Sequence, residues 1–171
     1  MRLRDTGMGF GVITIGMHWV GAFLVIAFTL ASLAALLLPS VTPGRGMILL
    51  GVLSSAVSSF RLIWRFTHFY PLPMAPKPPV VLIAQRTMAL ALLLGGAVLP
   101  WLFFSLLARS TTAGLPDLFS VFPQWVIAAL FWAGSLLVIL TALVHAGAAI
   151  FGALARGDRS LERILGQKLE P

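Results

Sequence analysis

Long apolar stretches, each close to the length of a membrane-spanning helix, alternate with short polar connections along the whole chain. A hydrocarbon core about 30 Å thick requires about 20 mainly apolar residues, because an α-helix rises about 1.5 Å per residue. Four stretches meet this requirement, at approximately residues 11–38, 46–66, 81–108 and 123–155. The pattern therefore predicts an all-α, integral membrane four-helix bundle that forms a single transmembrane domain over residues 1–171.

The overall composition excludes a soluble domain and several kinds of metal site. Hydrophobic residues make up 59% of the chain and charged residues only 10%, whereas a soluble domain needs far more polar surface. The chain has no cysteine, which excludes iron–sulfur clusters and thiolate zinc sites. Any metal would therefore be held by histidine, methionine or carboxylate side chains.

The distribution of basic residues predicts the orientation of the four helices. Cytoplasmic connections of membrane proteins carry an excess of Lys and Arg. The segments before the first helix, around the connection between the second and third, and after the fourth hold ten of the 12 basic residues: Arg2, Arg4, Arg61, Arg65, Lys77, Arg86, Arg156, Arg159, Arg163 and Lys168. Both termini and the proline-rich connection of residues 67–79 are therefore expected in the cytoplasm, and residues 158–168 as an interfacial helix. Because the basic residues cluster between apolar stretches, they indicate topology and no nucleic-acid partner.

Two histidines are expected at similar depth in different helices. His18 lies about seven residues into the first stretch, and His145 lies about ten residues before the end of the fourth. Both positions correspond to about 10–15 Å below the cytoplasmic surface, an arrangement that suits ligation of one haem iron from its two sides. A transmembrane histidine is also commonly a structural hydrogen-bond donor. The small residues of the second stretch, Gly51, Ser55 and Ser59, would leave room for a macrocycle or simply allow close helix packing.

Several short segments together resemble the prokaryotic cytochrome b561 family. They are Ile15–Gly16–Met17–His18–Trp19, Arg61–Leu62–Ile63–Trp64–Arg65 with His68 and the following prolines, Val144–His145–Ala146, and Gly157–Asp158–Arg159–Ser160–Leu161. The resemblance extends over nearly the whole chain in helix number and connection lengths. It implies a four-helix cytochrome of the bacterial inner (cell) membrane that binds b haems and exchanges electrons with quinones or with redox partner proteins.

The resemblance carries over to one haem site and not to the other. His18 and His145 correspond to the family's ligands for the cytoplasmic-side haem, so they are the expected ligands of its iron. The positions of the second ligand pair hold Met47 and Phe131, which predicts a single haem b per chain. Arg61 is the best candidate to pair with a haem propionate, with Arg65 and Arg86 as others in the same region. All three arginines equally suit a role as topology anchors that reach the interface.

Three classes of function follow from these features. The first is a one-haem electron carrier between a quinone pool and a redox partner, which would be a component of an oxidoreductase system rather than a stand-alone catalyst. The second is a haem-free or redox-inactive membrane anchor or accessory subunit of a larger complex. The third, a transporter or channel, is disfavoured because no acidic residue lies within an apolar stretch. Assembly as a homo-oligomer stays open.

Overall fold

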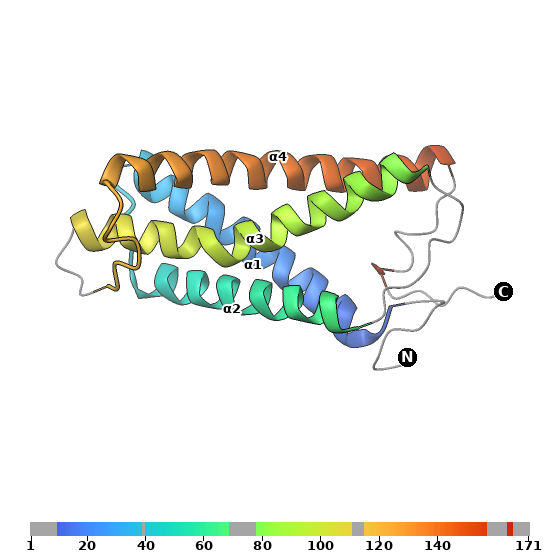
Figure 1. The fold of residues 1–171 in the computed structure, drawn as a ribbon, viewed down its shortest axis with the longest axis horizontal. Coiled ribbons are helices and arrows are strands. Elements are labelled where there is room, and N and C mark those ends of the chain that lie inside the picture. The colour runs from blue at the N-terminus through green and yellow to red at the C-terminus, as the bar shows by residue number, and fades with distance from the viewer. Residues whose placement is uncertain (1–9, 39, 69–77, 111–114, 157–163, 166–171) are drawn as a thin grey trace.

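The computed structural model consists of four long α-helices joined by short connections (Figure 1). It describes residues 10–38, 40–68, 78–110, 115–156 and 164–165. The helices are α1 (Val12–Leu37), α2 (Arg45–Thr67), α3 (Pro79–Ser110) and α4 (Gln124–Arg156). Every end lies within two residues of its predicted position, and the described residues contain no strand. All four helices are long and apolar enough to span a membrane, so the prediction of four helices of membrane-spanning length is confirmed. The side on which the termini lie stays a prediction, and all but two residues of the predicted 158–168 helix lie outside the described residues.

Prolines lie at or just before the starts of α2, α3 and α4. α3 begins with Pro79, whose missing N–H costs nothing in the first turn of a helix. α4 follows Pro123, whose carbonyl accepts hydrogen bonds from the N–H groups of Val126 and Ile127. α2 follows Gly44, which is itself preceded by Pro43 and adopts an extended conformation. Local chemistry and hydropathy therefore agree on the helix boundaries.

Consecutive helices run antiparallel, and the two ends of the bundle contain different kinds of residues. At one end α1 and α3 begin and α2 and α4 end (Figure 1). This end contains His18, Arg61 and His145 and is called the histidine end. The opposite end is called the aromatic end, because its core is built around four phenylalanines: Phe28, Phe103, Phe104 and Phe131. α3 packs on both α2 and α4, and α1 packs mainly on α2.

The aromatic end is closely packed. All four phenylalanine side chains are at most 1% exposed. The Phe103 ring lies 5.7 Å from both the Phe28 and the Phe131 ring, measured between centroids. Ring pairs at such distances contribute stability beyond the area that they bury. The rings fit close to the backbone, since a Cβ on Gly51 would lie 2.6 Å from Phe104 and 2.8 Å from Phe28. The glycine is therefore required for the packing of α2 against this core.

Serine side chains of α2 fix its position against α3. Pro100 has no N–H, so the carbonyl of Gly96 loses its usual partner four residues later in α3. The buried hydroxyl of Ser54 donates a hydrogen bond to that carbonyl over 3.3 Å, and the hydroxyl of Ser55 donates to the Ala97 carbonyl over 2.8 Å. In a membrane such partners are needed because no water can replace them. The proline and the serines therefore form one structural unit.

The connection between α3 and α4 is held by one arginine at the aromatic end. Arg109 Nε donates to the Asp117 carboxylate over 2.7 Å, and its two terminal nitrogens donate to the carbonyls of Phe119 and Phe122. The hydrogen bond from Arg109 is the main reason that the pKa of Asp117 lies below its ordinary value. The described part of this connection, residues 115–123, is thus held by a side chain from the preceding helix.

The helices separate toward the histidine end. Buried residues of the described helices lie within positions 21–32 of α1, 51–58 of α2, 93–107 of α3 and 127–141 of α4. The last turns of α2 and α4 and the first turns of α1 and α3, which form the histidine end, have none. Figure 1 shows α3 moving away from α2 in this direction. The core therefore occupies one end of the bundle and the histidines the other.

Candidate functional site

The two transmembrane histidines lie next to each other across the α1–α4 interface. The centroids of the His18 and His145 rings are 6.4 Å apart and their planes are inclined by 49°. Both residues are half-buried. The antiparallel arrangement of α1 and α4 brings them to one level, although 126 residues separate them in the sequence. This pair is the centre of the candidate site.

Arg61 of α2 completes the cluster. Its Nη2 lies 3.3 Å from Nδ1 of His18. A guanidinium only donates, so Nδ1 accepts and the proton of a neutral His18 ring is assigned to Nε2. The charge of Arg61 also interacts electrostatically with His145. Arg61, expected as a propionate partner, therefore lies at the level of the imidazoles themselves.

Gly21, one turn after His18, makes room for this arginine. A Cβ at position 21 would lie 2.7 Å from Nη1 of Arg61, 3.2 Å from its Cδ and 3.4 Å from Cγ1 of Val57. A side chain at this position would thus collide with the guanidinium. The closeness of Gly21 to Arg61 was not expected from the sequence. Counting depth along antiparallel helices places Gly21 and Arg61 at similar distances from the same end, but depth alone does not show that the two residues face each other.

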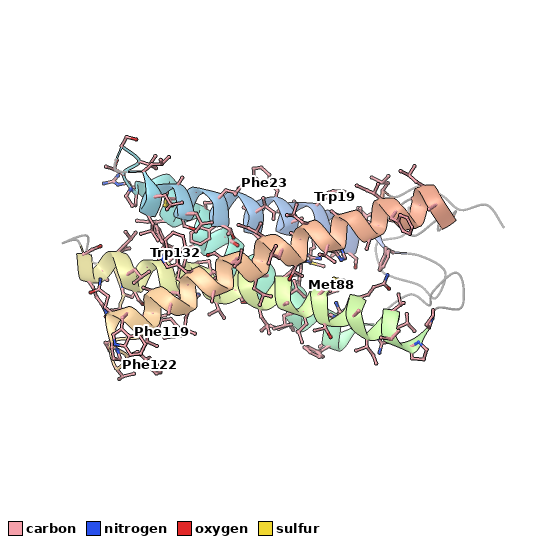
Figure 2. The ribbon with its side chains drawn as sticks, turned by 90° about the horizontal axis from the view of Figure 1, so that it is seen from above. Trp19, Phe23, Met88, Phe119, Phe122 and Trp132 are labelled. Atoms are coloured by element: carbon pink, nitrogen blue, oxygen red, sulfur yellow. The ribbon has the colours of Figure 1, made fainter. Side chains whose placement is uncertain are left out.

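One tryptophan contacts His18, and a second contacts Thr14, one turn before His18 in α1. The Trp19 ring meets His18 edge-on at 5.3 Å, and its indole N–H donates to the carbonyl of Ile164 over 3.0 Å. Figure 2 shows Trp19 on α1 toward the histidine end. Trp64 donates to the Thr14 hydroxyl over 3.2 Å and stacks on His68 with ring centroids 3.5 Å apart. The contact of Trp19 with Ile164, which follows α4, was not expected from the sequence.

The positions of the second ligand pair belong to the aromatic core. Phe131 is fully buried and packs on Phe103, and Met47 packs against the same cluster while partly buried. Ser55 and Gly51, two members of the small-residue stripe of α2, are used there for contacts with α3 and with phenylalanine rings. Of the two roles considered for these small residues, the structure therefore displays close packing.

Two further candidate arginines lie in the helices at the histidine end. Arg65 is half-buried and Arg86 is exposed, both toward the histidine end. Lys77 and the basic residues before position 10 lie outside the described residues. At the other end, an apolar groove of about 350 Å³ is lined by Leu33 of α1 and by Trp132, Ala133, Leu136 and Ile139 of α4. Trp132 is labelled in Figure 2. Its lining is compatible with lipid contact.

The donor set of the site is small. Within the part of the chain that the structure describes, no three His, Cys, Asp or Glu side chains come together. Two imidazoles alone do not complete a tetrahedral protein site. They do suit an iron whose other four positions are filled by a macrocycle.

No protein-family model, curated protein or solved structure shows a significant match to this chain. The resemblance to the cytochrome b561 family accordingly stays a prediction from the sequence, and the function must be argued from the site.

Proposed function

We propose that this chain is a membrane b-type cytochrome in which His18 and His145 hold one haem. The observation that carries the proposal is the spacing of the two rings. A metal–nitrogen bond of about 2 Å plus about 1 Å from nitrogen to ring centre, counted twice, gives about 6 Å between centroids. The separation of 6.4 Å in the structure agrees with this value.

The surroundings of the histidines also support a flat ligand. The residues nearest to them in the helical stretches include Gly21, Ala142 and Ala149, which are small. The helices separate at this end, whereas at the other end the space between them is filled by phenylalanine rings. A guanidinium close to the site suits the carboxylates of a haem, since arginine pairs with carboxylate groups strongly.

Bound in this way, a haem would supply one-electron chemistry. The chain would orient it through His18 and His145, and the apolar helices would place it within the bilayer. In line with the family resemblance, we propose a quinone pool and a redox partner protein as the electron-exchanging partners, and the bacterial inner membrane as the location. The described residues identify no quinone site.

Ligand replacement with spectroscopy tests the proposal. In protein purified without haem limitation, H18A and H145A should each lose or strongly shift the reduced α-band. The third histidine provides the matched control, because His68 stacks on Trp64 and has no expected role in ligation. H68A should therefore keep the spectrum. Normal spectra in H18A and H145A would refute the assignment.

A redox-inactive anchor or accessory subunit is the second candidate. The hydrogen bond between Arg61 and His18 favours it, because it gives this histidine a partner within the chain itself. The same purification distinguishes the two functions. Colourless wild-type protein, obtained from cells supplied with haem precursor, would favour the anchor.

A further inference from the structure

Arg61 carries a permanent positive charge, and its side chain lies in a confined position beside the histidine pair. We infer that the positive charge of Arg61 raises the reduction potential of the haem. We also infer that the absence of a side chain at Gly21 allows Arg61 to lie beside the histidines. The inference rests on the proposed function, because it concerns a haem held by His18 and His145. It goes beyond a propionate contact, since it assigns the arginine an effect on the iron through its charge.

The place of the arginine is defined by two helices. Its Nη2 reaches Nδ1 of His18 over 3.3 Å. Its stem passes Gly21, where an added Cβ would lie 3.2 Å from Cδ and 2.7 Å from Nη1. Val57 of the same α2 helix borders the same space. Arg61 is half-buried, so its charge is screened by solvent less than that of an exposed side chain.

The sign of the effect follows from the charges of the two iron states. A haem iron with two neutral imidazoles carries one net positive charge when ferric and none when ferrous. A fixed positive charge nearby therefore disfavours the ferric state, and it does so more strongly away from water. Metal-bound histidines usually donate their second N–H to a carboxylate or carbonyl, which has the opposite effect. At His18 the second nitrogen instead faces a cation.

The inference depends on the position of the charge rather than on one hydrogen bond. Ligation of a neutral His18 through Nε2 would leave the ring proton on Nδ1, which could then no longer accept from Arg61. The stem would still be bordered by Gly21 and Val57, and the guanidinium interacts electrostatically with both histidines. The charge therefore stays near the site when the donor changes its partner.

Optical redox titration of purified variants tests the inference. R61Q removes the charge and should lower the midpoint potential by at least about 59 mV, a tenfold change in the ferric-to-ferrous ratio at fixed potential. R61K keeps a charge and should shift the potential much less. G21A leaves Arg61 in the chain but displaces the guanidinium, so it should lower the potential in the same direction.

Two variants serve as matched controls. G16A makes the same Gly-to-Ala change in α1, two residues before His18, where an added Cβ meets nothing within 4 Å. R45Q removes one positive charge from the opposite end of α2, where Arg45 is exposed. Both should keep the wild-type midpoint potential.

The outcomes separate this inference from the proposed function. Haem-free wild-type protein would refute the proposed function and the inference with it. Haem-containing R61Q with the wild-type potential would refute the inference alone. If R61Q fails to retain haem, the comparison of G21A with G16A decides: equal potentials overturn the inference, and a lower potential in G21A alone supports it.

Discussion

The number of haems per chain is the most direct consequence of the unequal ends of the bundle. We predict one, because the aromatic end holds Phe131 and Met47 at the positions where a second ligand pair would lie. The Phe131 side chain is 0% exposed and packs on Phe103, so it fills the space as well as lacking a donor atom. A pyridine-haemochrome assay against protein concentration should give a ratio near one.

The structure also sets how far this haem would lie from the other surface. From His18 to Leu37 at the end of α1 there are 19 residues, which corresponds to about 28 Å at about 1.5 Å per residue. Electrons should therefore enter and leave at the histidine end only. In sealed proteoliposomes, a membrane-impermeant reductant should rapidly reduce only the haems whose histidine end faces outward.

A single cysteine measures the orientation in the same vesicles. The chain has no native cysteine, and Val121 is 85% exposed in the connection at the aromatic end. In V121C, the fraction protected from an impermeant thiol reagent should equal the fraction of haem reduced rapidly. A ratio near two haems per chain, or rapid reduction of all haem irrespective of orientation, would refute the reasoning. A ratio near zero would contradict the proposed function instead.

Three further predictions concern topology and stability. In intact cells, V121C should be labelled by an impermeant thiol reagent and K77C should not; the reverse result would overturn the orientation deduced from basic residues. S54A should lower the free energy of unfolding in detergent by about 1 kcal/mol. In the double variant with P100A, the restored N–H can pair with the Gly96 carbonyl, so the loss caused by S54A should be smaller. Strictly additive effects of the two substitutions would contradict the shared use of this carbonyl. The hydrogen bond from Arg109 lowers the pKa of Asp117 below the ordinary 3.8. The contribution of the Asp117 carboxylate to stability should therefore be complete above pH 3.8 and lost as the pH falls below that value. D117N should remove this part of the acid sensitivity of the protein, and unchanged acid sensitivity in D117N would contradict the prediction.

The sequence predicts the helices well because two independent signals coincide at their ends. Apolar length defines each span, and prolines such as Pro79 and Pro123 define where α3 and α4 begin. A constant rise per residue then relates positions on antiparallel helices. The adjacency expected for His18 and His145 follows from this counting, and the 6.4 Å between their rings is consistent with it.

Contacts that depend on helix rotation were not predictable from the sequence in the same way. In a soluble bundle the polar face of a helix indicates which side points outward, but lipid-facing and buried residues are both apolar here. α3 carries apolar residues on all of its faces, so the sequence does not indicate that residues 102–107 are all buried while residues 79–92 are not. The packing of the Arg61 side chain beside Gly21 depends on the relative rotation of α1 and α2, and the sequence did not predict this contact for that reason.

A haem confined to one end would also limit what the protein contributes to the membrane potential. Moving one charge across a membrane stores about 2.3 kcal/mol per 100 mV. A second haem at the aromatic end would allow electrons to do this within one chain. Here the phenylalanine core leaves about 28 Å along α1 between His18 and the opposite end without a described haem ligand. Electron transfer between a quinone and a partner that both react at the histidine end would therefore run along the bilayer surface and generate no potential. A potential-sensitive dye in oriented proteoliposomes should stay silent during turnover, whereas a sustained signal would require an electron path through the aromatic end.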